Sequence, residues 1–509
     1  MEMTLGRILL INANKYPGRE AVIMEDGRVT FSQLNDNANQ RANALVNLGV
    51  KKGDHVAILA PNCIELVESL FGIWRTGAVV VPLNTRLSPN ELSYIIDHSD
   101  ASAILFVDGF RETIKQIMPK IKKVKRFLCV GKNPLHDFID FEKEKSQQST
   151  EAPLIEVKEE DIATIVYTAG TTGKPKGVVA THKNWVWESI DKLFASWSSF
   201  YKAQKVLNTN PLFHSGGFLN LFWSFFPGQT IVLLTKAAPK NIFQWIEKEK
   251  VERVHTQPTV YAMMLQFPDI QKYDLSSVKL VGSGGERMPE ETRNQLENIF
   301  PGAGIYELYG LTEECGTATV RLDRYTKAKP SSVGRSFLFE EIRIVDEQGK
   351  DVPVGEVGEV ILRCPHMMKE YYKDPEKTAN AIRGGWLYTD DLGRLDEDGF
   401  LYINERKKNM IVSGGENIYP KEVEDVLLRH PKIVEVAVFG VPDKVWGERI
   451  CAAIVLENGK QMTADEVIGF CKQNIASFKK PKSVYFVNSL PKSPMNKVLR
   501  SELKKMFQN

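Results

Sequence analysis

The chain has 509 residues, 43% of them hydrophobic and 26% charged, which excludes a disordered or fibrous protein and predicts several domain-sized units. Its 66 basic residues nearly balance 64 acidic ones, so charge gives no reason to expect nucleic acid as a partner. The six cysteines are scattered, without a Cys-x-x-Cys pair or a histidine spacing that predicts a metal site. Free thiols in a reducing cytoplasm are therefore expected.

Membrane segments are not expected from the sequence. The apolar run at residues 8–11 is too short for a signal peptide, and no uninterrupted stretch of about 18 apolar residues occurs. The basic stretch at residues 115–125 favours a solvated helix face over a lipid-binding patch. We expect small-molecule partners, without nucleic acid or integral membrane association, and the sequence leaves open whether the chain forms a homodimer.

Residues 1 to about 160 alternate apolar strands with amphipathic helices, which predicts a parallel sheet. The expected elements are strands at 56–60, 78–82 and 103–107 and a helix at 63–74. Ser88 to Glu91 combine a capping box with a proline at the first helical position. A second helix is therefore expected from Pro89 to about His98.

A second unit of the same type is expected from about Asp161 to Gly310. Its predicted elements are strands at 231–234 and 278–281 and a helix at 289–300. Residues 320–405 then change to glycine-punctuated strands such as 358–363, and the dipeptide Asp398-Gly399 predicts a hairpin. This part is expected to be a β-rich subdomain.

A charged segment, residues 405–409, indicates a linker between a large and a small domain. After it, helices are expected near Pro420 and at the capping box from Thr463 to Glu466. The predicted fold class is α/β. It comprises a large N-terminal domain (residues 1–404) with two βαβ-type sheet subdomains and a β-rich subdomain, and a small α+β domain (residues 410–509).

Threonine, glycine and lysine residues crowd the segment from Thr168 to Gly177. Hydroxyl and backbone N–H donors, close backbone approach and positive charge are what a polyphosphate needs. The spacing does not fit a Walker motif, because Val178 to Ala180 continue as a strand where a Walker loop would open a helix. Composition alone supports a phosphate loop and a flexible hairpin turn equally.

The segment from Tyr167 to Gly177 resembles the signature loop of the acyl-adenylate-forming (AMP-binding) family, which contains acyl-CoA synthetases, carrier-protein adenylation domains and firefly luciferase. Further motifs of the family follow in order along essentially the whole chain. They are Pro211 to His214, Gly282 to Glu286, Tyr309 to Glu313, Thr389 to Asp391, Arg406 to Lys408, Ser413 to Pro420 and Pro491 to Lys497. The segment from Ser413 to Pro420 is most similar to acyl-CoA synthetases.

The resemblance implies sites for ATP, Mg²⁺ and coenzyme A. The residues implied to bind the nucleotide or coenzyme A are Thr168, Ala169, Gly170, Thr171, Thr172, Gly173, Lys176, Gly284, Gly285, Glu286, Tyr309, Gly310, Asp391, Arg406, Gly414 and Gly415. Within this set Tyr309 would stack on adenine, Asp391 would hold the ribose hydroxyls, and Arg406 would be a second contact to the ribose or to a phosphate. Without the family, Tyr309 is typical of strand-end packing, Asp391 of a turn and Arg406 of a linker.

Four residues are implied to be catalytic. Glu313 corresponds to the family's magnesium ligand, and Thr312 to its phosphate-contacting hydroxyl. Lys497 would bring positive charge to the α-phosphate during adenylation. His214 would lie at the acid substrate, whereas the aromatic residues at 218–226 fit a core helix equally well.

The resemblance also implies that the small domain is mobile. It would rotate between the half-reactions about the hinge residue Lys408, which lies in the 405–409 linker. This rotation would remove Lys497 and present the strand of Gly414 and Gly415 to the thiol channel.

Three residues of the nucleotide and lysine motifs depart from the family pattern, and the pair Lys369-Glu370 replaces a further usual glycine in an expected peripheral turn. Ala169 replaces the usual serine of the loop and removes about 0.5–1.5 kcal/mol of hydrogen bonding. Asp390 and Asn496 stand where glycine usually precedes the ribose aspartate and the catalytic lysine. Asparagine tolerates a positive φ better than other non-glycine residues do, whereas Asp390 adds negative charge near the nucleotide.

The sequence therefore predicts an ATP-dependent, AMP-forming acid–CoA ligase, with fatty acid metabolism as its expected context. It would form an acyl-AMP with release of pyrophosphate and then transfer the acyl group to coenzyme A. Three alternatives stay open: an adenylation enzyme that loads a carrier-protein phosphopantetheine, a luciferase-like oxygenase, and a nucleotide-binding regulatory relic. The acid itself is not predicted.

Overall fold

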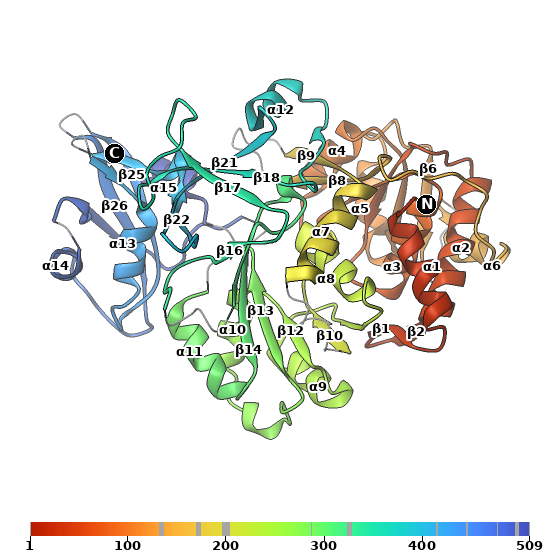
Figure 1. The fold of residues 1–509 in the computed structure, drawn as a ribbon, viewed down its shortest axis with the longest axis horizontal. Helices are drawn as coiled ribbons and strands as arrows, with labels where there is room; N and C mark the ends of the chain where they lie inside the picture. The colour runs from red at the N-terminus through yellow and green to blue at the C-terminus, as the bar shows by residue number, and fades with distance from the viewer. Residues whose placement is uncertain are drawn as a thin grey trace. The chain divides into compact units, whose positions relative to one another are not determined.

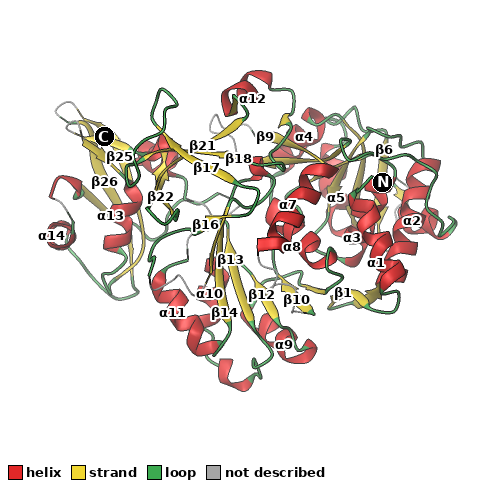
Figure 2. Cartoon of the chain, viewed as in Figure 1, coloured by secondary structure: helices red, strands yellow, loops and turns green. Residues whose placement is uncertain are grey.

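A computed structural model of the chain describes residues 2–131, 137–168, 175–195, 204–286, 288–322, 328–413, 416–443, 446–475, 477–493 and 498–507. The chain divides into two compact units, and helices and strands occur in both (Figures 1 and 2). The first unit comprises Met1–Ile342 and Leu362–Leu387, and the second comprises Arg343–Ile361 and Tyr388–Asn509. The fold is α/β, as predicted.

An eight-stranded sheet of described residues lies in the first unit, in the order β19-β9-β8-β4-β3-β5-β6-β7. Its strands are β3 (His55–Leu59), β4 (Val79–Pro82), β5 (Ala101–Val107), β6 (Arg126–Val130), β7 (Ile139–Asp140), β8 (Ile162–Thr168), β9 (Lys176–Thr181) and β19 (Glu370–Tyr371). Strands β3 to β8 pair in parallel, which confirms the predicted parallel sheet. Strands β9 and β19 extend it in antiparallel fashion.

Helices α4 (Pro89–His98) and α5 (Arg111–Ile117) pack on this sheet, and α6 (Phe141–Ser146) lies beside β6. The predicted capping box of α4 is present, because the Ser88 side chain accepts from the Glu91 amide and the Glu91 carboxylate accepts in return. Apolar side chains of α4, α5 and the strands form one buried cluster. The predicted helix from Pro89 to about His98 is confirmed.

Aromatic rings join the helices α2 (Phe31–Asn47), α3 (Ile64–Arg75), α7 (His182–Ala195) and α8 (Ser215–Phe225), and α1 (Leu5–Lys15) packs against all four. Trp74 of α3 and Trp185 of α7 both contact Phe218 of α8. The two indole N–H groups donate to β8, at the Ala163 carbonyl and the Thr164 hydroxyl, each over 3.0 Å. Since residues 217–225 are all buried, α8 is a core helix.

A second, nine-stranded sheet of described residues has the order β16-β15-β14-β13-β12-β10-β11-β1-β2. Its strands are β1 (Glu20–Met24), β2 (Gly27–Thr30), β10 (Lys205–Asn208), β11 (Thr230–Leu233), β12 (Arg253–His255), β13 (Leu280–Gly284), β14 (Gly304–Tyr309), β15 (Thr319–Leu322) and β16 (Arg335–Ser336). The run from β14 to β1 is parallel. Strand β13 begins two residues later than expected, because Val278 already packs in the core before the ladder starts.

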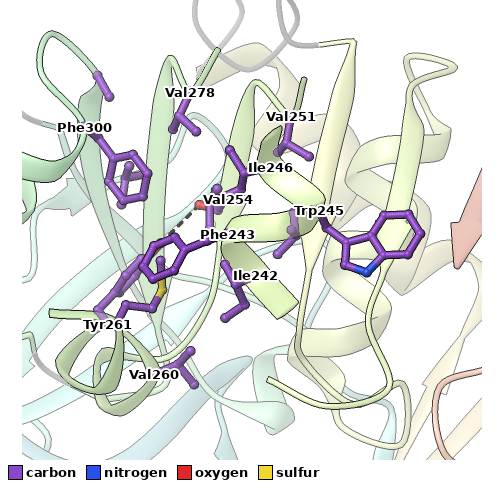
Figure 3. Packing of buried hydrophobic residues seen from close by; sticks show 14 of the residues in the cluster. Ile242, Phe243, Trp245, Ile246, Val251, Val254, Val260, Tyr261, Val278 and Phe300 are labelled. Carbon is purple, nitrogen blue, oxygen red and sulfur yellow. Dashed lines mark hydrogen bonds between the residues drawn. The ribbon is translucent and has the colours of Figure 1, made fainter. Parts of the chain in front are cut away.

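Helices α9 (Pro239–Glu249), α10 (Pro258–Leu265) and α11 (Glu290–Ile299) bury their apolar faces against this sheet. Figure 3 shows Ile242, Phe243 and Ile246 of α9 in the same cluster as Val254 of β12 and Tyr261 of α10. The Tyr261 hydroxyl lies 2.9 Å from the Gly282 carbonyl, so the polar end of this buried ring is satisfied. This packing holds β12 and β13 in place.

A third sheet has the order β17-β18-β21-β20, with β22 paired to β21. Its strands are β17 (Glu341–Val345), β18 (Gly358–Arg363), β20 (Ile382–Arg383), β21 (Trp386–Leu395) and β22 (Leu401–Arg406), and α12 (Pro375–Ala381) precedes β20. The predicted Asp398-Gly399 hairpin is confirmed: Leu395 pairs with Leu401, and Gly399 has a φ of +77°.

The C-terminal residues form a fourth sheet, in the order β24-β23-β26-β25 with β27 paired to β26. Its elements are β23 (Ile411–Ser413), β24 (Glu416–Ile418), α13 (Pro420–Leu427), β25 (Ile433–Asp443), β26 (Gly447–Leu456), α14 (Ala464–Asn474), β27 (Ser483–Phe486) and α15 (Arg500–Met506). The Thr463–Glu466 capping box begins α14, as predicted. In the described part of the chain, no helix is long and apolar enough to cross a membrane.

Candidate active site

The predicted phosphate loop joins two antiparallel strands of the first unit. Strand β8 ends at Thr168, β9 begins at Lys176, and these two residues are partners in the ladder. The continuation of β9 to Thr181 agrees with the non-Walker prediction. The buried hydroxyl of Thr168 has no hydrogen-bond partner among the described residues. A polar group that is buried in this way suits a ligand that accepts or donates a hydrogen bond.

Lys176, Glu313 and Tyr371 form one contact group. Lys176 Nζ lies 2.8 Å from Glu313 Oε1. The Tyr371 hydroxyl donates to Glu313 Oε1 over 2.9 Å and accepts from Lys176 over 2.6 Å. The three residues come from β9, from the 3₁₀ turn η3 (Thr312–Glu314) and from β19. The group therefore connects the hairpin to the turn that follows β14.

Glu313 is held in its ionised form by this group. Burial raises the pKa of Glu313, but the charge of Lys176 and the hydrogen bonds from Lys176 and Tyr371 together outweigh burial, so its pKa lies below the ordinary value. An ionised carboxylate is the oxygen ligand that Mg²⁺ favours. The chemistry of Glu313 therefore fits the role expected of it.

The predicted adenine-binding residues lie where two parallel strands end. Gly284, at the end of β13, pairs with Leu308 of β14, and Tyr309 is the last residue of β14. Gly285 follows with a φ of +84°, which favours glycine, and no described atom lies within 4 Å of the position of a Cβ there. Ligands of open α/β sheets bind at such carboxyl edges. The exposed Glu286 comes next.

The turn after β14 lies against the start of α8. Gly310 must be glycine, because a Cβ there would lie 2.2 Å from the Gly316 carbonyl oxygen. The Thr312 hydroxyl is 3.2 Å from the hydroxyl of Ser215, the first residue of α8. His214 is the N-cap residue of α8. These hydroxyls and the helix N-terminus make a region that favours a negatively charged group.

The predicted ribose-binding residues lie together in the second unit. Asp391 of β21 and Arg406 of β22 are ladder partners, and Arg406 Nε lies 2.6 Å from Asp391 Oδ1. The Asp391 amide donates to the Thr389 hydroxyl over 3.0 Å. Asp390 is exposed and has a φ of +59°, so the position where the family usually has glycine does adopt a left-handed backbone.

Several predicted site residues lie outside the described residues, and their roles stay predictions. They are Ala169, Gly170, Thr171, Thr172, Gly173, Gly414, Gly415 and Lys497. Around the two glycines, Ser413 pairs with Glu416. On either side of Lys497, Lys492 and Val498 form an isolated antiparallel β-bridge. Lys408 lies in the 3₁₀ turn η5 (Lys407–Asn409).

Tyr371 is a candidate functional residue that sequence reasoning missed. It lies 58 residues after Glu313 and 195 after Lys176, and nothing in its local pattern indicates a contact with either. Its place is decided by the pairing of β19 with β9, where Tyr371 is opposite Val178.

The geometry and the motifs define an adenylate-forming enzyme. Residues 10–372 match the model of the AMP-binding enzyme family, and residues 422–497 match the model of the AMP-binding enzyme C-terminal domain. The chain therefore belongs to the AMP-binding enzyme family. The CoA ligases of this family form an acyl-AMP and then a coenzyme A thioester. The predicted family, fold class and ligase class are confirmed.

Curated relatives are similar over nearly their whole length. A long-chain-fatty-acid–CoA ligase of Bacillus subtilis is 36% identical, over 98% of this chain and 94% of that protein. A feruloyl-CoA synthase of an Amycolatopsis species is 33% identical, over 99% of both chains. The relatives are thus acyl- and aryl-CoA ligases.

Solved structures are similar in fold. An anthranilate CoA ligase in complex with anthranoyl-AMP has a TM-score of 0.90 at 28% identity, covering 99% of this chain and 97% of that one. The o-succinylbenzoate coenzyme A synthetase of Bacillus subtilis, in complex with ATP and magnesium ion, has a TM-score of 0.87 at 30% identity. The match covers 99% of this chain and 100% of that one.

Proposed function

We propose that the chain is an ATP- and Mg²⁺-dependent acid–CoA ligase that forms an acyl-AMP and transfers the acyl group to coenzyme A. The observation that carries the proposal is the Lys176–Glu313–Tyr371 group beside the signature hairpin. Similar proteins that are CoA ligases, and a similar structure in complex with ATP and magnesium ion, support the same reaction.

The described residues suit ATP and magnesium. Thr168 offers a buried hydroxyl, Lys176 offers positive charge, and the backbone at Gly285 is open on one side. Glu313 would hold the metal, because Lys176 and Tyr371 keep it ionised. When bound, magnesium supplies positive charge that offsets the negative charge of the leaving pyrophosphate.

The first half-reaction brings two anions together, so its barrier is mainly electrostatic. A carboxylate oxygen of the acid attacks the α-phosphorus of ATP, and the bond from that phosphorus to pyrophosphate breaks. Lys176, Thr168 and Thr312 would bind and orient the phosphates. In the second half-reaction the coenzyme A sulfur loses its proton and bonds to the acyl carbon, and AMP leaves.

Lys497 is proposed to act in the first half-reaction alone. We expect Lys497→Ala to slow acid-dependent pyrophosphate release by about 100-fold or more, while acyl transfer from supplied acyl-AMP to coenzyme A changes by less than about 3-fold. Lys492→Ala is the matched control, because Lys492 lies in the same segment but pairs with Glu435 at 2.8 Å. Equal loss in both half-reactions would refute the role of Lys497. Pyrophosphate release without a free thioester would indicate a carrier protein as acceptor.

The domain arrangement is part of the proposal. Residues 1–404 would form the adenylating domain, residues 405–409 the hinge, and residues 410–509 a domain that rotates about Lys408 to bring Gly414 and Gly415 into use. The short turn η5 at this place supports a hinge. Lys408→Pro, which fixes φ, should slow thioester formation more than pyrophosphate release.

The acid is proposed to be a fatty or aryl acid, within fatty acid or aromatic acid metabolism. The relatives that support this are a long-chain-fatty-acid–CoA ligase and a feruloyl-CoA synthase. His214, at the start of α8, is proposed to lie at the acid. Pyrophosphate release measured with short, medium, long-chain and aromatic acids would identify the substrate class. A cytoplasmic location is proposed because all six cysteines are free thiols, and cell fractionation would test it.

A further inference from the structure

Four potential metal ligands gather inside the first unit, apart from the Lys176–Glu313–Tyr371 group. They are Glu314, Glu340, Cys364 and His366, all buried, and one ligand atom from each lies within 4.8 Å of the others. Glu314 ends the turn η3, Glu340 directly precedes β17, and Cys364 and His366 follow the end of β18. Three separate segments thus contribute to one cluster.

The polar atoms of this cluster are poorly satisfied within the described part of the protein. Both carboxylate oxygens of Glu314, both of Glu340, and Nε2 of His366 are buried without a hydrogen-bond partner. The side chains of Glu314, Glu340 and His366 are 0% exposed. Buried polar groups without partners are strongly unfavourable, so this arrangement calls for protons or a bound cation between the side chains.

The orientation of His366 indicates what that species is. Its Nδ1 lies 3.0 Å from the Glu314 carbonyl oxygen, to which the Nδ1–H donates, and 3.3 Å from Cys364 Sγ, so in the neutral ring Nε2 carries the lone pair. Nε2 is 3.3 Å from Glu340 Oε2. Two acceptors at this distance repel each other unless a proton or a cation lies between them. Histidine ligands of metals commonly donate their other N–H to a backbone carbonyl in this way.

The charge around the cluster also favours a cation. Lys192 interacts electrostatically with four buried carboxyl groups, those of Glu188, Glu314, Glu340 and Asp191. With all four carboxyl groups ionised, one lysine would leave three negative charges in a buried region, which either protons on the carboxyl groups or a bound cation must neutralise. A divalent cation would remove most of that excess, and buried charges need such compensation.

We propose that Glu314, Glu340, Cys364 and His366 bind one divalent transition-metal ion, of which Zn²⁺ is the best match. Sulfur and nitrogen donors favour zinc over magnesium or calcium, and four protein ligands make a closed structural site. Bonds of about 2.0–2.3 Å place tetrahedral donors roughly 3.3–3.8 Å apart, so a contraction of about 1 Å completes the site. The metal would join two segments: the turn η3, which carries Glu313, and the residues that follow β18.

The test is metal binding by the full chain, which does not depend on ligase activity. After chelator treatment and dialysis, the protein is titrated with Zn²⁺ or Co²⁺ and its metal content is measured by elemental analysis. We expect one equivalent of tightly held metal, a thiolate-to-Co²⁺ absorption band in the near ultraviolet, and a Tm rise of about 5 °C with Zn²⁺. No retained zinc and no thiolate band in the wild-type chain would overturn the proposal and leave protons as the compensating species.

Variants locate the metal. Cys364→Ser should abolish the thiolate band, and His366→Gln should lower the affinity for Zn²⁺ by about 10-fold or more. Cys63→Ser is the matched control: Cys63 lies in the same unit, away from the cluster, at the N-cap of α3, and this variant should bind metal as the wild type does. Loss of the band in Cys63→Ser with retention in Cys364→Ser would contradict the assignment. If Cys364→Ser does not fold, the wild-type titration and the Zn²⁺ affinity of Glu340→Gln test the site instead. Glu340→Gln should bind Zn²⁺ more weakly than the wild type does.

Discussion

Asp390 adopts a backbone conformation that glycine adopts at lower cost. Its φ is +59° and its side chain is exposed, so the strain is not offset by burial. We expect Asp390→Gly to raise the free energy of unfolding by up to about 1 kcal/mol in urea titrations. Asp390→Ala removes the charge and keeps the Cβ, so equal stabilisation by both variants would mean that charge, and not φ, is the cause.

Tyr371 is expected to affect catalysis through Glu313. Tyr371→Phe removes the hydroxyl that bonds both Glu313 and Lys176 while it keeps the ring under Lys176 at 4.2 Å. Loss of about 1–2 kcal/mol of hydrogen bonding should lower kcat/KM for ATP by roughly 5- to 30-fold. Tyr372→Phe is the control, because the Tyr372 hydroxyl donates to Asp100 instead. A similar kinetic loss in both variants would contradict a specific role for Tyr371.

His255 makes stability depend on pH. Burial lowers the pKa of His255 to about 3, and Arg253 acts in the same direction. The unfolded chain takes up the proton below about pH 6.5 and the native chain does not, so this contribution is full above pH 6.5 and is lost as pH falls. Between pH 6.5 and 5, we expect the wild type to lose about 2 kcal/mol more than His255→Gln in urea unfolding. Parallel pH profiles would contradict the shift.

At the scale of elements, capping decides where helices begin. The Thr463 hydroxyl accepts from the Glu466 amide over 3.2 Å, and Glu466 accepts from the Thr463 amide over 2.7 Å. We expect Thr463→Ala to lower the free energy of unfolding of the C-terminal region by about 1 kcal/mol. In urea titrations this would appear as a lower midpoint with an unchanged dependence of the free energy on urea concentration. Ser88→Ala should have a similar effect on α4, whose capping box has the same geometry. An effect below about 0.3 kcal/mol would mean that packing alone sets these helix ends.

At the scale of the whole molecule, the C-terminal residues have a core of their own. Two buried clusters, one around Ile411 and Val438 and one around Phe439 and Leu503, contain only residues from 411 to 507. We expect a fragment of residues 410–509 to fold alone, with a cooperative urea transition of about 5 kcal/mol. A non-cooperative transition with little secondary structure by circular dichroism would contradict this domain boundary.

Local signals in the sequence predicted most of the elements and the family. The capping boxes at Ser88 and Thr463 and the Asp398-Gly399 turn are each made within a few residues, so their sequence suffices to predict them. The motif order along the chain predicted the ligase class. The start of β13 was predicted two residues early, because apolar character alone does not separate a ladder from the core residue before it.

Contacts between distant segments were decided by the tertiary structure alone. Tyr371 reaches Glu313 and Lys176 only because β19 pairs with β9. Glu314 and His366, 52 residues apart, meet because η3 lies beside the end of β18. The sequence by itself thus determined the reaction class and the local elements, which depend on short-range hydrogen bonds and periodicity. Which ionisable side chains share one buried region depended on sheet pairing and packing, which no short stretch of sequence encodes.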